Sequence, residues 1–396
     1  MIAHIFKMIW NRKKSNALII AEVAIAFMVI FALSVLAIRN FNLSQIPLGF
    51  DYDNMWRVEV SNAASWDPAK DQPTIMQILL SLEQESEIES VSLMSSPTFK
   101  NWVWSTSYDL DGQEIAFMAN RINDGAAESF GMELQAGRWF GPQDDGQNYL
   151  PVLVSQLFVD KYFPGQDIIG KNIASDENRE STEMRVVGVF KAFRQLGEFS
   201  RLRPYVFHRI NLNEPHRRPL SGIELKLKPD TKIIYEEKLL KLLKGIAPQW
   251  DYDIKTWSSQ RETMMRETLL PMIVLSIVGC FLIIMVAMGL FGVLWQNVTS
   301  RTHEIGLRRA LGATANQIQN QIVGELLLVS LLGIAFAFII LVQLPMLGVF
   351  VELDWPLFFK SLIVATVFML TLAALCAYYP GKVATNYAPA EALHYE

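Results

Sequence analysis

Four long apolar runs interrupt an otherwise mixed pattern of hydrophobic and polar positions, and they predict four membrane-spanning helices. The runs cover residues 17–38, 269–295, 326–351 and 357–381. A helix of about 20 residues crosses the hydrocarbon core of a bilayer, so each run is long enough. The fourth contains one charged residue, Lys360, near its start and is free of charge from 361 to 381.

The first apolar run could be either a membrane anchor or a secretory signal peptide. It exceeds the apolar core of about 7–15 residues that signal peptides carry, and no small-residue cleavage site leads into a polar mature start. We therefore expect an uncleaved anchor. Glu22 lies about 9 Å along the helix from Asn16, so its carboxylate can reach the headgroups or face another helix.

Basic residues gather at one side of the four runs and set the expected orientation. They precede the first run and follow the second and fourth: Lys7, Arg12, Lys13, Lys14, Arg301, Arg308, Arg309 and Lys382. The connection between the third and fourth runs carries Glu352 and Asp354 instead. Because basic loops stay on the cytoplasmic side, we expect both termini, residues 296–325 and the tail 382–396 to be cytoplasmic and residues 39–268 to lie outside.

Residues 1–16 carry apolar side chains at helical spacing beside the basic cluster. The apolar positions are Ile2, Ile5, Phe6 and Ile9, with Trp10 next to them. Such a segment is typical of an amphipathic helix lying in the cytoplasmic interface. The alternative is an ordinary basic flank with no role of its own.

The outer segment 39–268 is too long for a loop and predicts a folded α+β domain. Its two ends share a strand–helix–strand pattern, in which alternating apolar residues give way to a helical period and then alternate again. We expect these ends, 51–96 and 220–258, to form one split βαβ lobe close to the membrane. Residues 97–219 between them predict a β-rich distal lobe.

The distal lobe contains a basic stretch, residues 185–218, and several expected strands. YLPVLVSQLFVDKYFP indicates a strand followed by a helix, and TEMRVVGVFKAF and LRPYVFHRI indicate strands. The arginines and lysines of the basic stretch could recognise an anionic partner or could simply cover solvated strand faces. The sequence leaves both readings open.

Composition and motifs give no sign of an enzyme. The formal net charge of -5 argues against a nucleic acid as the main partner. Cys280 and Cys376 both fall inside apolar runs, which rules out a disulfide framework. The segment HEIGL lacks the second histidine of a zinc-protease motif, with Leu307 in its place, and no phosphate-cradling GxxxxGK[ST] segment occurs. We expect no catalytic residue, no metal site and no bound cofactor.

The charged stretch SRTHEIGLRRALGATANQIQ, residues 300–319, lies between the second and third runs and predicts two short helical segments. Arg301, Glu304 and Arg308 share one helix face, so Glu304 can pair with either arginine. Gly312 should end this helix. Thr314 and Gln317 should form a capping box that starts the next one. A short helix presenting paired charges with Ile305 and Leu307 is a docking element; the alternative is a loop that only fixes topology.

The same stretch resembles the coupling helix of MacB/FtsX-like permeases of ABC transporters. That family carries the pattern [R/K]-x-x-E-I-G-x-x-[R/K]-A-L-G-A, and the matching residues here are Arg301, Glu304, Ile305, Gly306, Arg309, Ala310, Leu311, Gly312 and Ala313, followed by Glu325. The tail YPGKVATNYAPAEALHYE is similar to the family's ending, with Pro380, Ala384, Pro389, Glu391, Ala392 and Leu393 matching and His394 replacing the usual arginine. GFD at 49–51, LQAGRWF and MRVVGVF resemble its extracytoplasmic domain.

This resemblance implies a permease that docks onto a separate cytoplasmic ATPase dimer. The docking residues would be Arg301, Glu304, Ile305, Gly306, Arg308, Arg309, Ala310, Leu311 and Gly312. ATP and magnesium would be used by the partner, and the permease would sit in a bacterial inner membrane with its large domain in the periplasm. A second permease copy, identical or related, would complete the assembly, and a periplasmic partner is compatible with it.

Two functions fit the resemblance. The first is a permease that transmits ATP-driven motion to its outer domain and so drives export or extraction of a substrate from the periplasm or outer leaflet. The alternative is an FtsX-like regulator that activates a cell-wall hydrolase; the large outer domain favours the first. Small residues four apart on the spans, which allow close helix packing, suggest dimer contacts: Ser276/Cys280, Gly333/Ala337 and Ala373/Ala377.

Overall fold

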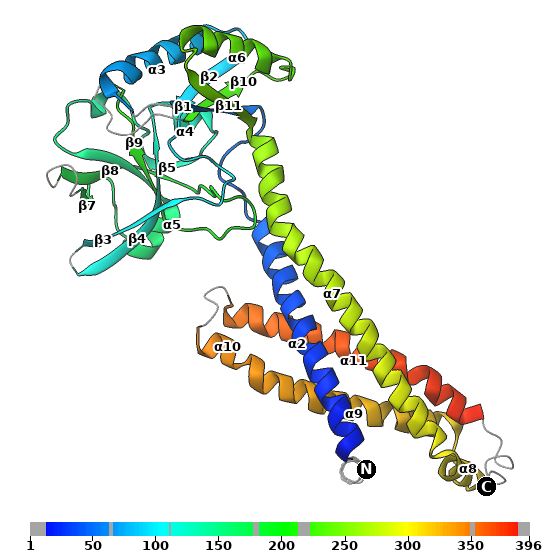
Figure 1. Cartoon of the computed structure of the whole chain (residues 1–396). Helices are drawn as coiled ribbons and strands as arrows, with labels where there is room; N and C mark the ends of the chain where they lie inside the picture. Colours follow the sequence, from blue (N-terminus) through cyan, green and yellow to red (C-terminus); the bar gives the residue numbers. More distant parts are fainter. Residues whose placement is uncertain are drawn as a thin grey trace. The chain divides into compact units, whose positions relative to one another are not determined.

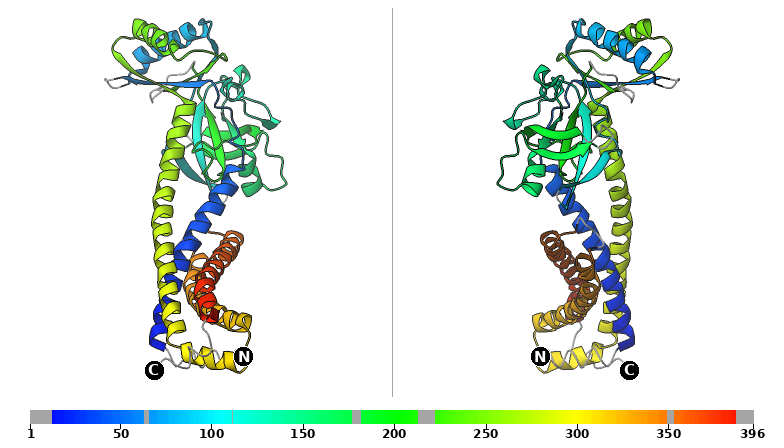
Figure 2. Two further views of the ribbon diagram at one scale, coloured as in Figure 1. Left: turned by 90° about the vertical axis from the view of Figure 1, so that its right-hand side faces the viewer. Right: turned by 90° about the vertical axis from the view of Figure 1, so that its left-hand side faces the viewer.

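The computed structural model describes residues 13–62, 66–110, 112–176, 182–212, 222–348 and 353–386. It divides into two compact units, Leu43–Thr268 and a unit formed by Met1–Asn42 with Leu269–Glu396 (Figures 1 and 2). We call the first the soluble domain and the second the helical unit. The expected interfacial helix lies largely outside the described residues, as does the part of the tail from 387 onward.

The helical unit is built from long apolar helices. Among the described residues, four helices are long and apolar enough to cross a membrane: α2 (Lys13–Ser44), α7 (Trp257–Thr299), α9 (Ala315–Leu341) and α11 (Trp355–Asn386). The helices run past the apolar runs at most ends, because backbone hydrogen bonding continues into polar flanks that apolar composition does not mark. The part of α7 before residue 269, for example, is the largely polar stretch WSSQRETMMRET.

The expected third span, 326–351, falls on a candidate span that the structure shows from Ala315 to Met346, and residues 349–351 lie outside the described part of the chain. Helix α9 stops at Leu341, and the short helix α10 (Gln343–Met346) follows. Pro345 lacks the N–H that would bond the carbonyl of Leu341, so the helix cannot continue regularly. At the same turn, the side-chain amide of Gln343 donates to the Ile339 carbonyl at 3.0 Å.

Close contacts between helices use small residues within this one chain. A methyl group added at Gly333 on α9 would lie 2.7 Å from the side chain of Val23 on α2. Ala337, Ala373 and Ala377 are also fully buried. Two of the three small-residue pairs therefore pack inside the chain and are not free for a second copy, whereas Ser276 and Cys280 remain exposed on α7.

Glu22 lies against α7. A methyl group added at Gly289 would come within 2.3 Å of its carboxylate. Of the two positions expected for this carboxylate, the structure therefore shows the one that faces another helix. The absence of a side chain at residue 289 makes room for a charged group inside the bundle, and such groups normally face the bundle interior rather than lipid.

The soluble domain contains a four-stranded antiparallel sheet covered on one face by two helices (Figures 1 and 2). Its strands run in the order β11-β1-β10-β2: β1 (Met55–Asn62), β2 (Ile88–Leu93), β10 (Gly222–Leu227) and β11 (Trp250–Thr256), with helices α3 (Pro68–Glu83) and α6 (Tyr235–Ile246). The two strand–helix–strand units interleave, since β10 lies between β1 and β2. Apolar residues of α3 and α6, such as Ile78 and Leu239, are buried with strand residues such as Val58.

A second, mixed sheet is built from the middle of the chain. Its order is β3-β4-β9-β6-β8-β5, with β7 paired to β8: β3 (Trp104–Leu110), β4 (Gln113–Ile122), β5 (Leu134–Gly137), β6 (Leu150–Ser155), β7 (Asn172–Asp176), β8 (Thr182–Phe190) and β9 (Tyr205–Arg209). Short helices α4 (Ala126–Ser129) and α5 (Gln156–Tyr162) accompany it. The predicted fold class, four long apolar helices with a mixed α/β domain, is confirmed.

Arginines of the basic stretch bond to the chain itself. Arg209 pairs with Asp124 at 2.6 Å and with Asp145 at 2.7 Å, and Arg185 pairs with Glu183 at 3.2 Å. Arg194 is buried and bonds to backbone carbonyls. Residues 213–218 of the stretch lie outside the described part of the chain. The contacts of these three arginines favour a structural role for them over an anion-binding surface.

Candidate functional site

The charged stretch between α7 and α9 forms helix α8 (Thr302–Ala310). The helix ends in two reverse hydrogen bonds, from the N–H of Gly312 to the Arg309 carbonyl at 3.1 Å and from the N–H of Ala313 to the Arg308 carbonyl at 3.0 Å. This pair of bonds is the Schellman motif, which needs a left-handed residue after the helix. Gly312 supplies it with φ 98°, as its position predicted.

Helix α9 starts only a few residues later, and its start is equally well defined. The N–H of Gln317 donates to the Thr314 hydroxyl at 3.3 Å, and the N–H of Thr314 donates to the Gln317 side chain at 2.9 Å. These reciprocal bonds are the expected capping box. Because a defined end and a defined start leave little slack between them, α8 is held at a fixed angle to α9.

A chain of polar contacts joins α8 to the N-terminal part of α9. Glu304 pairs with Arg308 at 2.5 Å, and Arg308 also donates to the Gln321 side chain at 2.7 Å. Gln321 donates to Glu325 at 3.0 Å, and Glu325 pairs with Arg301 at 2.9 Å. Of the two arginines that could pair with Glu304, Arg308 does so. Arg301 pairs with Glu325 of α9.

The inner face of α8 is apolar and packs on its neighbours. Ile305 is buried with Val298 of α7 and Ile318 of α9, and Gly306 is buried beside it. Ile305 was expected on the docking surface, but its burial means that it holds α8 in place and does not offer contact area. Sequence spacing alone could not show which side of so short a helix would turn inward.

The outer face of α8 presents two leucines to solvent. Leu311 is 80% exposed and Leu307 is 47% exposed, and they lie one turn apart. Ala310 is exposed between them, whereas Arg309 is half-buried and engaged in an interaction with the chain. An exposed leucine alone is ordinary. A pair on a rigid helix beside Glu304 and Arg308 makes a compact apolar surface with a charged border, which suits a protein partner.

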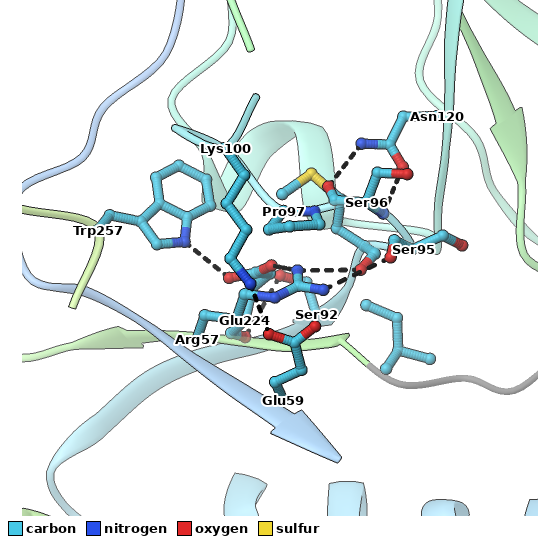
Figure 3. Close-up of polar contacts among 12 residues, drawn as sticks. Arg57, Glu59, Ser92, Ser95, Ser96, Pro97, Lys100, Asn120, Glu224 and Trp257 are labelled. Atoms are coloured by element: carbon cyan, nitrogen blue, oxygen red, sulfur yellow. Dashed lines mark hydrogen bonds and ion pairs between the residues drawn. The ribbon is translucent and has the colours of Figure 1, made fainter. Parts of the chain in front are cut away.

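In the soluble domain, charged residues are buried where β1, β10 and the start of α7 meet (Figure 3). Arg57 and Glu224 lie directly opposite on the two strands, form an ion pair and are only 1% and 0% exposed. The indole N–H of Trp257, the first residue of α7, donates to Glu224 at 2.7 Å. Arg57 also donates to the Met94 carbonyl at 3.1 Å.

The surroundings of this buried pair satisfy most of its polar atoms. Burial raises the pKa of Glu224, and the charge of Arg57 and the Trp257 N–H act in the opposite direction. Nearby, Lys100 pairs with Glu59 at 3.0 Å and lies over the same face of the sheet (Figure 3). None of these residues was singled out from the sequence, because Arg57 and Glu59 occupy the polar positions of an ordinary alternating strand.

A second arginine fastens the chain as it leaves α2. Arg194 donates to the carbonyls of Leu43 and Ile46 at 3.1 and 2.5 Å, and to the carbonyl of Ser200 at 2.6 Å. The loop that carries Arg194 also provides Glu198, which pairs with Arg261 of α7. Within the soluble domain, the end of α2 and the beginning of α7 are therefore fixed to the same loop.

Two family models match the chain. The MacB-like periplasmic core domain matches residues 17–234, more than half of the chain, and the FtsX-like permease C-terminal domain matches residues 265–389. The second match includes α8 with its surroundings. The two models leave residues 1–16, 235–264 and 390–396 unmatched, and the middle gap contains α6, β11 and the first turns of α7.

Curated relatives are similar over about half of the chain. The macrolide export ATP-binding/permease protein MacB of Neisseria gonorrhoeae is 27% identical over 209 residues, covering 51% of this chain and 31% of that protein. The corresponding protein of Neisseria meningitidis serogroup A is 28% identical over 210 residues, with the same coverage. The chain spans about a third of the length of these relatives, and the match does not include their whole ATP-binding/permease architecture.

Among solved structures, the periplasmic region of MacB from Actinobacillus actinomycetemcomitans is 17% identical, with a TM-score of 0.40, and the match covers 55% of this chain and 94% of that one. The extracellular domain of the noncanonic ABC-type transporter YknZ is 15% identical, with a TM-score of 0.35, and covers 50% and 99%. The assignment of the chain to a family rests on the two family models and on how much of the chain they match. The protein belongs to the MacB/FtsX-like family of permeases.

Proposed function

We propose that this chain is the permease subunit of an ABC transporter that turns ATP hydrolysis by a separate cytoplasmic ATPase into movement of its periplasmic domain. That movement drives export or extraction of a substrate from the periplasm or outer leaflet. ATP and magnesium are bound by the ATPase, and α8 is the element on which the ATPase docks. The partners are an ATPase dimer and a second permease copy in the bacterial inner membrane.

The observation that carries this proposal is the way α8 is held. Its inner face and its polar contacts fix it to α7 and α9, while Leu307 and Leu311 stay exposed. A loop that only sets topology needs neither a fixed angle nor exposed leucines. A helix that receives a push from a partner needs both, because a flexible attachment would absorb the displacement.

Helix α7 is the element that can carry the displacement onward. It is one helix of 43 residues from Trp257 to Thr299. Its first residue is bonded to the buried Glu224 of the soluble domain, and its last residue directly precedes the segment that enters α8. Pro271 removes one backbone hydrogen bond inside this helix, so a displacement received at α8 would reach the soluble domain along the axis of α7 or through a bend at that residue.

The second copy should associate through α7. Only 11% of the apolar window of α7 is buried within the chain, against 28% or more for the other three helices. Its exposed face includes Ser276 and Cys280, the pair of small residues that the chain does not use internally. Lipid can cover such a face, so the proposal requires a dimeric mass in nanodiscs with the ATPase present; a monomeric mass would contradict it.

The proposed topology can be tested by cysteine labelling of intact cells. Asn148 in the soluble domain and Asn316 at the start of α9 are both exposed, so a cysteine at either position is accessible on its own side. A membrane-impermeant maleimide should modify Asn148→Cys and spare Asn316→Cys until the cells are permeabilised. The reverse pattern would show that the chain has the opposite orientation and that α8 lies outside the cytoplasm. The proposed function would then be wrong.

The docking role of α8 can be tested by reversing a charge. Glu304→Lys places a second positive charge next to Arg308. We expect reduced ATPase co-purification or loss of ATP-dependent activity, while the amount of permease in the membrane stays unchanged. The matched control is Glu237→Lys, which breaks a similar exposed pair with Lys241 on α6, formed at 2.6 Å. Normal ATPase association and activity in Glu304→Lys would show that α8 only fixes the topology of the chain and does not dock the ATPase.

A second change tests the fixed angle of α8 instead of its charge. Gly312→Val puts a β-branched residue at φ 98°, where side chains are strongly disfavoured. The helix end should be disturbed and coupling should weaken while insertion into the membrane is unaffected. Gly348→Val, also at a positive φ of 59° but beyond α10, is the control. Equal activity of both variants would show that the angle of α8 is unimportant.

A further inference from the structure

A cleft of about 570 Å³ lies between the first turns of α7 and the segment that joins β2 to β3. Its size is within the range of about 300–1,000 Å³ found for small-molecule sites. Seven of its nine lining residues carry polar side chains, and the two aromatic ones are Phe99 and Trp102. More of the lining surface is nevertheless apolar than polar, so the cleft suits a ligand that combines an apolar face with polar groups.

The aromatic side of the cleft combines an exposed tryptophan with a buried phenylalanine. Trp102 is 63% exposed although it is large and apolar. Phe99 next to it has φ 54°, a strained conformation for a bulky residue. Its N–H donates to the Gln195 carbonyl at 2.8 Å and its ring packs against Phe50. Strain that the surroundings hold in place is typical of ligand sites.

The floor of the cleft contains an amide with no partner. Gln260 of α7 lines the cleft and is 6% exposed, and neither its amide nitrogen nor its amide oxygen bonds to any group in the described part of the chain. A buried donor and acceptor left unpaired are costly and rare. The terminal torsion of glutamine is soft, so a small rotation can turn both atoms toward an occupant of the cleft.

Charges around the cleft compensate each other. Lys100 pairs with Glu59 and Lys255 pairs with Asp253, and the carboxylate of Glu267 accepts a hydrogen bond from a lining asparagine amide. No charge of one sign dominates the rim. A neutral ligand that both donates and accepts hydrogen bonds is therefore favoured over an anion or a cation.

We propose that this cleft binds a neutral saccharide of one or two sugar units. A pyranose ring has an apolar C–H face that can stack on the indole of Trp102, and its hydroxyl groups both donate and accept, as the amide of Gln260 requires. A peptide strand is the less suitable occupant. It would add to the edge strand β11, but that edge carries the exposed charges Asp251, Asp253 and Lys255, which oppose strand addition.

Binding is tested on the full chain in lipid nanodiscs without any ATPase, so that the result is independent of the proposed coupling. The probes are cellobiose, maltose and N,N′-diacetylchitobiose, with trialanine amide as a peptide probe and empty nanodiscs as the blank. Saturation-transfer NMR should show transfer to sugar ring protons for at least one disaccharide, and calorimetry should give its dissociation constant.

Two variants separate a binding site from a structural defect. Trp102→Ala should weaken binding at least about tenfold, as expected from the loss of a stacked ring. Gln260→Leu should weaken binding similarly while leaving the melting temperature unchanged or higher, because the unpaired amide is gone. Leu80→Ala, at an exposed position on α3 outside the cleft, should bind normally. Absence of binding by every disaccharide, unchanged affinity in both cleft variants, or preferential binding of the peptide would each overturn the proposal.

Discussion

Glu224→Ala is expected to destabilise the soluble domain by about 3–5 kcal/mol, because it leaves the Arg57 guanidinium buried without its counter-charge. The two side chains are 0% and 1% exposed and lie opposite each other on β10 and β1. The same change removes the acceptor of the Trp257 N–H. The start of α7 should therefore loosen together with the sheet.

Hydrogen exchange of the full chain in detergent is the appropriate measurement, since it reports local opening without requiring reversible unfolding of a membrane protein. Protection of amides in β1 and β10 should fall by about a hundredfold or more in Glu224→Ala. The double variant Arg57→Met with Glu224→Leu should recover much of it, because an apolar pair of similar volume avoids the cost of burying charges. Glu133→Ala, which breaks the exposed pair with Lys191, should change little. Full protection in Glu224→Ala would contradict the assigned role of the pair.

Leu311→Asp is expected to weaken ATPase binding by thirtyfold or more, on the order of 2 kcal/mol for the loss of a central apolar contact. The side chain is 80% exposed, so the folded permease itself should be affected by no more than about 0.5 kcal/mol. A large effect on association with almost none on stability is the signature of an interface residue.

The affinity of the purified ATPase for the full chain in nanodiscs checks this expectation. Leu311→Asn separates apolar contact from charge, because it should lose nearly as much affinity as Leu311→Asp if contact is what matters. Leu80→Asp, an equally simple change at an exposed leucine on α3, should bind normally. Wild-type affinity for the ATPase in both Leu311→Asp and Leu307→Asp would show that the ATPase does not dock on α8.

Features that depend on neighbours along the chain could be predicted from the sequence alone. The end of α8 and the start of α9 are set by hydrogen bonds that span no more than five residues, from Arg308 to Ala313 and from Thr314 to Gln317. Glycine, threonine and glutamine at those positions have few other conformations that satisfy the same backbone groups. The four long helices are equally predictable, because a bilayer leaves a long apolar segment no alternative to a helix.

The direction in which a side chain is buried was decided only by the tertiary structure. Ile305 and Leu311 look alike as apolar residues of one short helix, and the position of Ile318 on α9 determines that Ile305 is buried while Leu311 stays exposed. Arg57 and Glu224 are 167 residues apart, and each occupies a polar position of an alternating strand. Such a pattern predicts a solvated face. Only the packing of Trp257 and the segment around Met94 over that face turns the two charges into a buried pair, because burial depends on what covers a strand and not on the strand itself.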